Sequence, residues 1–214
     1  MKRGLRTAGE LGGQRAQVEV DRANTLGRRF LVGNGFAEVR RFWEMGLDLE
    51  ASKTGGKELA QVPCGCLLPG QEDVLTRLQN KSFTGSWGFN PNTVQEVAYA
   101  LTRGRGSIKD VLVAFSKGRP SGYCWLKLDP ETGPGVGRVH MLGVVPESRQ
   151  RGAGFSVLSW GLDRLREMGC KRAVLTVDRL NPPALALYQR AGFAPLSETI
   201  WYEKDLIHPD RPPG

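Results

Sequence analysis

The chain has 214 residues, 40% of them hydrophobic and 24% charged, so it can bury a sizeable core as one large domain or two small ones. This composition excludes disordered, fibrous and solenoid classes. The net charge of +8 comes from scattered basic pairs without a basic tail, so no nucleic-acid partner is expected. No apolar run approaches the ~20 residues of a membrane span. Because the four cysteines lack C-x-x-C spacing, we expect a cytoplasmic protein with no metal, disulfide framework or membrane partner.

The sequence contains an internal repeat. Residues 4–49 align without gaps on residues 161–206, and fifteen of the 46 positions are identical. Residues 161–206 form the back half of a predicted domain, so 4–49 are expected to be the back half of an earlier copy whose front is missing. This predicts a truncated first copy over 1–49, a linker over 50–57, a complete domain over 58–206 and a tail over 207–214.

The predicted elements of the complete domain form a β-hairpin followed by alternating strands and helices. This order predicts an α/β fold with a mixed central sheet flanked by helices. In chain order we expect a strand near 59–68, helices over 71–82 and from 91, strands over 110–116, 122–128 and 138–145, a helix over 152–168, a strand over 172–177, a helix over 181–190 and two short strands over 193–205.

The segment that follows strand 138–145 has the chemistry of an anion site. It reads Arg149-Gln150-Arg151-Gly152-Ala153-Gly154 and opens the long helix. Backbone N–H groups of such a turn, together with the helix N-terminus, bind phosphate groups. The turn lacks the third glycine of a dinucleotide fingerprint and the Lys-Ser/Thr of a P-loop. An ordinary basic turn between a strand and a helix remains the alternative.

A second motif follows further along the chain and reads Asn181-Pro182-Pro183-Ala184-Leu185-Ala186-Leu187-Tyr188-Gln189-Arg190-Ala191-Gly192-Phe193. Together the two motifs resemble the GNAT superfamily of acyl-CoA-dependent N-acyltransferases. The two-copy organisation is similar to tandem members of the mycothiol synthase type. The resemblance implies the GNAT fold, acetyl-CoA as co-substrate, and acetyl transfer to a primary amine of a small molecule or peptide.

The resemblance also implies a role for single residues on the acetyl-CoA side. Backbone N–H groups from Gln150 to Gly154, with the charges of Arg149 and Arg151, would hold the pyrophosphate. The pantetheine arm would run beside Leu142, Gly143 and Val144, and the N–H of Val144 would face the thioester oxygen. Asn181 would touch the pantetheine or a catalytic water, with a simple helix N-cap as the alternative.

Tyr188 matches the family's general acid, which protonates the departing thiolate. The alternative is an aromatic residue of the core. At the equivalent place the first copy has Leu31, so the first copy is expected to have lost this acid.

On the acceptor side, His140 is the first candidate for a general base, because it lies four residues before Val144 on the same strand. A structural histidine is the alternative, and Glu131 and Glu198 are weaker candidates for the base. Trp87 and Phe89 lie in an aromatic loop where the family builds its acceptor wall, although they could equally fill the core.

Two other functions remain open from the sequence. A non-catalytic acyl-CoA-binding or scaffold module would keep the fold without turnover, and a basic nucleic-acid binder would show steep salt dependence. The incomplete first copy would leave an unpaired sheet edge, so the sequence also favours self-association through that copy.

Overall fold

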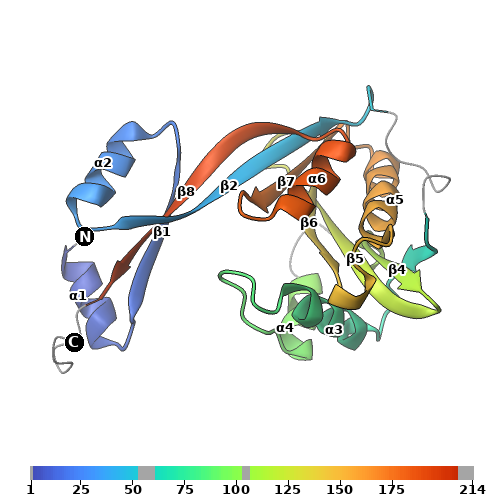
Figure 1. Cartoon of the computed structure of the whole chain (residues 1–214), viewed down its shortest axis with the longest axis horizontal. Coiled ribbons are helices and arrows are strands. Elements are labelled where there is room, and N and C mark those ends of the chain that lie inside the picture. The colour runs from blue at the N-terminus through green and yellow to red at the C-terminus, as the bar shows by residue number, and fades with distance from the viewer. Residues whose placement is uncertain (1, 53–60, 103–106, 207–214) are drawn as a thin grey trace. The chain divides into compact units, whose positions relative to one another are not determined.

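The computed structural model describes residues 2–52, 61–102 and 107–206 (Figure 1). The chain divides into two compact units. The smaller unit gathers Met1–Glu44, Thr176–Pro182 and Pro195–Gly214, and the larger gathers Met45–Leu175 and Pro183–Ala194. This division differs from the boundaries predicted from the sequence, because it places the last strand with the N-terminal segment.

The elements, in chain order, are α1 (Lys2–Glu10), β1 (Arg15–Asp21), α2 (Thr25–Gly33), β2 (Ala37–Asp48), β3 (Cys64–Cys66), α3 (Glu72–Phe83), α4 (Val94–Thr102), β4 (Val111–Ser116), β5 (Arg119–Leu128), β6 (Val136–Val144), α5 (Ala153–Glu167), β7 (Arg172–Asp178), α6 (Pro182–Arg190) and β8 (Ala194–Asp205). Short 3-10 turns precede β4 and follow β6. The strand order is β1-β8-β2-β7-β6-β5-β4-β3. The mixed α/β sheet predicted from the sequence is therefore confirmed.

The larger unit is built on strands β3 to β6, which pair antiparallel in sequence order. Strand β6 then pairs parallel with β7, but only over Val136–Arg138 against Arg172–Val174. Beyond Arg138 this pairing ends, and no other strand among the described residues pairs with the second edge of β6. The two strands separate on the side of β6 that leads to the predicted anion turn.

Alternation along β5 distributes its side chains between two helical layers. Tyr123 and Trp125 pack with Leu75 of α3 and Val97 of α4 in one buried cluster. On the opposite face, Cys124 lies 2.9 Å from the position that a Cβ on Gly161 of α5 would take. The helices α3 and α4 therefore cover one face of this part of the sheet and α5 covers the other (Figure 1).

The smaller unit has its own apolar cluster. Leu31 of α2 and Phe36 are buried against Ile200 and Tyr202 of β8. Strand β8 pairs antiparallel with β1 from Arg15↔Asp205 to Asp21↔Thr199. The sequence predicted two short strands around Ser197, and this is wrong, since β8 runs unbroken from Ala194 to Asp205. The pairing with β1 and the burial of alternate side chains keep this segment extended.

The bounds of the elements follow the sequence repeat. Adding 157 to the bounds of β1, α2 and β2 gives those of β7, α6 and β8, and the end of α1 likewise maps onto the end of α5. Two backbone hydrogen bonds repeat in the same way. The N–H of Arg22 donates to the carbonyl of Glu198 at 2.8 Å, and the N–H of Arg179, its equivalent, donates to the carbonyl of Arg41 at 3.0 Å. Position 41 is the equivalent of position 198, so the two contacts are reciprocal.

The remaining predicted elements lie within a few residues of the observed ones. The strand expected near 59–68 is limited to β3, and residues 53–60 of the predicted linker and domain start lie outside the described residues. The tail 207–214 also lies outside them. Across the described part of the chain, no helix combines the length and the apolar character needed to cross a membrane.

Candidate active site

The end of β6 has backbone groups that no strand in the described part of the chain uses. The N–H of Val145 donates to the carbonyl of Ser121 on β5 at 3.0 Å. Backbone groups of successive strand residues point to opposite sides, so the N–H of Val144 points away from β5. On that side β6 has already left β7. The structure therefore offers an N–H donor at the predicted thioester position.

The turn after β6 has the backbone shape of an anion cradle. Gln150 and Gly152 adopt the left-handed conformation, with φ of +58° and +82°. Gly152 is also the N-cap of α5 and supplies no side chain to satisfy the first N–H groups of the helix. These groups and the positive end of the 15-residue helix are therefore available to an anion. Arg151 is exposed beside them.

Arg149 has a structural role in addition to its predicted one. Its Nε donates to the carbonyl of Val144 at 3.2 Å, and its Nη2 donates to the carbonyl of Ser82 at 2.9 Å. The guanidinium thus ties the end of β6 to the end of α3.

Gly143 is required by packing, because a Cβ there would lie 2.7 Å from the Tyr123 ring and 2.8 Å from Cβ of Ser82. Leu142, the residue before Gly143, is half-buried.

A segment from before β3 lies over the same turn. The hydroxyl oxygen of Ser156, on α5, accepts hydrogen bonds from the N–H groups of Gln61 and Val62 at 2.8 and 3.2 Å. The side chain of Gln61 then reaches Gly152, where a Cβ would meet its Oε1 at 2.1 Å. The Gln61 side chain can lie here because residue 152 is a glycine. A phosphate in the cradle would displace the flexible end of the exposed Gln61 side chain. The uncapped start of α5 and the charge of Arg151 are the features that suit a diphosphate.

Tyr188 lies on the helix that borders the turn. Helix α6 packs on the first turn of α5, because a Cβ on Gly154 would touch Leu187 of α6 and Val144 of β6, each at 3.4 Å. The Tyr188 ring is buried and meets Phe193 edge-on at 6.0 Å. Burial, and then the neighbouring Cys124 thiol, raises the pKa of the Tyr188 phenol. The phenol therefore keeps its proton at neutral pH, as a proton donor must.

The two remaining residues predicted on the acetyl-CoA side are Ala153 and Asn181. Ala153 is buried at the start of α5. Asn181 precedes α6, and its backbone N–H donates to the carbonyl of Asp178 at 3.0 Å. Asn181 falls in the smaller compact unit and is exposed. Its contact with pantetheine therefore stays a prediction.

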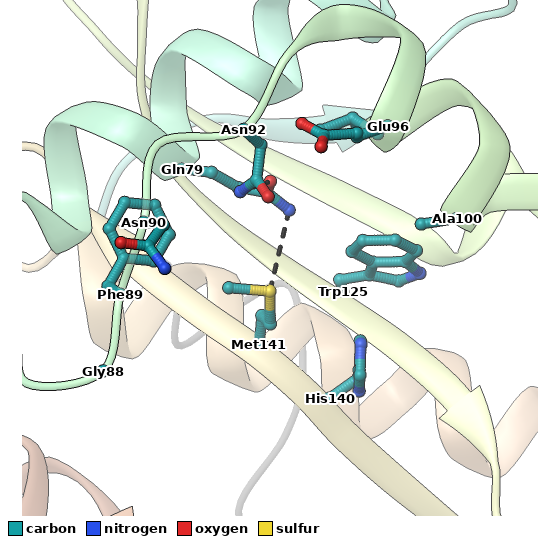
Figure 2. Close-up of a pocket in the computed structure, with 11 residues that line it drawn as sticks. Gln79, Gly88, Phe89, Asn90, Asn92, Glu96, Ala100, Trp125, His140 and Met141 are labelled. Atoms are coloured by element: carbon teal, nitrogen blue, oxygen red, sulfur yellow. Dashed lines mark hydrogen bonds between the residues drawn. The ribbon is translucent and has the colours of Figure 1, made fainter. Parts of the chain in front are cut away.

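A cavity of about 380 Å³ lies on the α3–α4 side of the sheet (Figure 2). Its floor carries Trp125 of β5 and two neighbours from β6, His140 and Met141. The rest of the wall comes from α3, α4 and the loop between them, and four of its eight residues have polar or charged side chains. These residues are Gln79, Gly88, Phe89, Asn90, Asn92, Glu96, Val97 and Ala100.

The polar wall of the cavity is held by its own hydrogen bonds. Nδ2 of Asn92 donates to Oε1 of Gln79 at 3.2 Å, and Nε2 of Gln79 donates to Sδ of Met141 at 3.6 Å, the contact dashed in Figure 2. The Glu96 carboxylate accepts from the N–H and the hydroxyl of Thr93 at 2.7 and 2.9 Å. These bonds from Thr93 lower the pKa of Glu96, so the wall carries a negative charge at neutral pH.

His140 owes its position to a β-bulge. Trp125 pairs with Met141 and Leu126 pairs with Val139, so His140 is an extra residue on β6. A bulge redirects the side chain of the inserted residue. Here His140 lines the cavity and meets the Trp125 ring edge-on at 5.1 Å. Desolvation, followed by the charges of Lys127 and Arg138, lowers the pKa of His140 to about 4. The imidazole is neutral at pH 7.

The other predicted acceptor-side residues differ in their placement. Phe89 lines the cavity and packs on Phe83 at 5.5 Å, whereas Trp87 is not part of the lining. Glu131 is exposed in the loop after β5. Glu198 is buried in the smaller unit, where Arg22 and Arg179 contact its carboxylate at 3.1 and 2.6 Å. These ion pairs occupy the carboxylate that was considered as a base.

Sequence reasoning missed most of the cavity. Gln79, Asn92 and Glu96 were not singled out, because each lies on or beside a helix where polar residues are common. Trp125 and Lys127 carried a usable signal, since they alternate on one strand of a hairpin with the strand of His140. In the described residues, no three His, Cys, Asp or Glu side chains form a group that could hold a metal ion.

Comparisons with known proteins agree with this geometry. The family model described as Acetyltransferase (GNAT) family matches residues 73–193. The chain is 29% identical over 173 residues to the mycothiol acetyltransferase of Arthrobacter sp. (strain FB24), covering 78% of this chain and 54% of that protein. It is 26% identical over 204 residues to the Cellulomonas flavigena protein of the same name, covering 91% and 59%. The chain thus spans about half the length of these relatives.

Solved structures show the same fold at lower sequence identity. A GCN5-related N-acetyltransferase from Sphaerobacter thermophilus has a TM-score of 0.71 and 21% identity, covering 90% of this chain and 60% of that one. Another, from Kribbella flavida, has a TM-score of 0.65 and 16% identity, covering 93% and 72%. Since the family model covers more than half of the residues and includes the β6–α5 turn and α6, the chain belongs to the acetyltransferase (GNAT) family.

Proposed function

We propose that this chain transfers an acetyl group from acetyl-CoA to a primary amine of a small molecule or peptide. The observation that carries the proposal is the joint position of three features at the end of β6. The uncapped turn Gln150–Gly154 and the outward N–H of Val144 lie at this strand end, and the buried Tyr188 follows Leu187 on the helix that packs against Gly154.

Each feature supplies one part of acyl transfer. The N–H groups of the turn, with the exposed Arg151, bind the diphosphate of the donor. The N–H of Val144 is a donor for the negative charge that develops on the thioester oxygen, an interaction worth about 3–4 kcal/mol in other enzymes. Tyr188 delivers a proton to the departing thiolate sulfur. The amine loses its proton on the other side of the strand, where His140 lines the cavity.

The cavity favours a polar acceptor with a cationic amine. Its wall presents three side-chain amides, Gln79, Asn90 and Asn92, and the ionised carboxylate of Glu96. The relatives are named mycothiol acetyltransferase. A small polar amine is therefore the first acceptor class to test.

A non-catalytic acyl-CoA-binding module is the competing function. Both functions require the cradle, but only an enzyme requires the Tyr188 hydroxyl. The test measures free thiol release from acetyl-CoA with a panel of amines and, in parallel, CoA binding by calorimetry. Binding without thiol release for any amine would assign the chain to the binding class. Absence of CoA binding would overturn both.

We further propose that residues 1–49 are the back half of a second GNAT copy. The coincident element bounds and the reciprocal bonds at Arg22 and Arg179 support this. The copy has Leu31, a buried core residue, at the position equivalent to Tyr188 and therefore no acid for thiolate departure. Strand β1 is the last in the strand order of the described sheet, and its second edge is the surface through which self-association would occur.

A further inference from the structure

The contact between Lys127 and His140 determines which nitrogen of the imidazole carries the proton. Nζ of Lys127 lies 3.0 Å from Nε2 of His140. A lysine ammonium has only donors, so a charged Lys127 requires a lone pair on Nε2. The proton of the neutral ring then sits on Nδ1. In this state Nδ1 is a hydrogen-bond donor, and the lone pair of Nε2 is occupied by Lys127, so the ring cannot accept a proton from an amine.

The Trp125 ring contacts both members of this pair. The Lys127 ammonium lies 4.7 Å from the centroid of the Trp125 ring, over its face. The same ring meets the imidazole edge-on. Lys127 and Trp125 come from one face of β5, and His140 comes from the bulge of β6. The indole therefore restricts both partners of the hydrogen bond.

We propose that Lys127 is a positioning residue that selects the tautomer of His140, and that the two side chains take up the amine proton as one unit. The proposal rests on the proposed acetyl transfer for its catalytic part. When Lys127 is neutral, Nζ accepts a hydrogen bond from Nε2–H, and Nδ1 carries a lone pair. When the attacking amine gives its proton to Nδ1, the proton on Nε2 passes to Nζ.

The proton balance of this step is complete. One proton leaves the amine nitrogen as its bond to the acetyl carbon forms, and one proton is gained by the Lys127–His140 pair. The pair ends as a charged Lys127 beside an Nδ1–H tautomer, and solvent removes the extra proton before the next turnover. A charged imidazole beside a charged ammonium at 3.0 Å is avoided throughout.

The other charged groups around His140 are consistent with this assignment. Arg138 lies two residues away on β6, but its Nε is bound to Oδ2 of Asp129 at 2.6 Å. Glu96 belongs to the far wall of the cavity and is held by Thr93. Lys127 is thus the charged group in direct contact with the ring among the described residues. Desolvation lowers the pKa of Lys127, which brings its neutral form closer to neutral pH.

Nitrogen NMR of the histidine rings tests the proposal without turnover. The chain has two histidines, His140 and His208, so His208→Gln leaves one signal set to assign. At pH 7 we expect His140 with a lone pair on Nε2 and a proton on Nδ1, and the reverse tautomer at alkaline pH. Lys127→Met should abolish this pH-dependent exchange. The control Lys171→Met removes the same charge from an exposed site and should leave the spectra unchanged.

Kinetics with one acceptor amine provide the second arm. For the native chain, kcat/KM should rise about tenfold per pH unit below the pKa of Lys127, the slope for loss of one proton. In Lys127→Met, kcat/KM should no longer show the rise with pH that comes from Lys127. Ionisation of the amine itself also changes kcat/KM with pH, but by the same amount in all variants. An Nε2–H tautomer at pH 7, or an unchanged exchange in Lys127→Met, would overturn the proposal. If no amine is acetylated but the tautomers behave as expected, the proposed function fails and the positioning role stands.

Discussion

Gly152 combines two requirements that substitution can separate. Its φ of +82° favours glycine, and its missing Cβ leaves the cradle open below Gln61. Gly152→Ala should lower the free energy of unfolding by about 1–2 kcal/mol, the cost of a left-handed conformation for an L-residue. Gly152→Asp adds a carboxylate at the place where a phosphate would bind.

The expected loss of binding follows from Coulomb's law. Two unit negative charges about 4 Å apart, at the effective dielectric of a site near the protein surface, repel by about 4 kcal/mol. This energy corresponds to a roughly 10³-fold larger dissociation constant for CoA. Calorimetric titration of CoA into Gly152→Asp measures the change directly, and thermal unfolding reports the backbone cost separately.

Gly169 is the matched control for this experiment. Its φ is +79°, and a Cβ there would meet nothing within 4 Å. Gly169→Ala should therefore show the same conformational cost as Gly152→Ala but leave CoA affinity unchanged. If Gly152→Asp bound CoA as tightly as the native chain, the turn would not be the phosphate site, and the assignment of α5 as an anion-binding helix would be wrong.

Three further predictions test other parts of the site. Tyr188→Phe should lower kcat for thiol release by about 10²–10⁴-fold with little change in the KM for acetyl-CoA, and a native kcat would assign the ring to the core. Gly143→Ala should destabilise the chain by about 1–3 kcal/mol in urea unfolding, since the new Cβ overlaps Tyr123 and Ser82, whereas Gly154→Ala should be mild. The lowered pKa of His140 means that the unfolded chain binds a proton that the folded chain does not between about pH 6.5 and 4. Stability should therefore fall as pH decreases through this window, and His140→Gln should reduce that slope.

The sequence predicted those parts of the fold that depend on local patterns. The helix over α5 follows from the spacing of Leu158, Leu162 and Leu165, all of which are buried. The turn before it contains Gly152, at a position that requires a left-handed backbone. The short strand β3 and the unbroken β8 were not predicted correctly, because strand length there depends on pairing with distant segments.

The candidate site also has parts that depend on local sequence and parts that depend on long-range pairing. The cradle and Tyr188 lie in contiguous motifs, so a single sequence can reveal them. The cavity wall is assembled from α3, α4, β5 and β6, and its polar residues have no common spacing. The bulge that places His140 also could not be predicted from the sequence, because it depends on the register of β6 against β5. Long-range register, and with it the contact to Lys127, required the structure.

Positions 41 and 198, which the repeat relates, carry opposite charges and contact each other. Arg41 and Glu198 are equivalent under the 157-residue shift, and their side chains lie 3.9 Å apart at Nη1 and Oε2. Arg22 and Arg179, also equivalent to each other, contact the same carboxylate. Identical residues at 41 and 198 would place like charges together at a site where Glu198 is only 5% exposed.

A charge exchange at these two positions tests this reasoning. Glu198→Arg gathers four arginines and removes the carboxylate that pairs with three of them, and breaking a buried ion pair in this way costs about 3–5 kcal/mol. The double variant Arg41→Glu with Glu198→Arg restores one carboxylate among three arginines and should recover part of the lost stability. Recovery will be incomplete, because Arg41 also binds Glu38 at 2.5 Å, whereas the equivalent of Glu38 is Pro195. Urea unfolding of the single and double variants measures the coupling. If the double variant were no more stable than Glu198→Arg alone, the cluster would act through packing and not through charge.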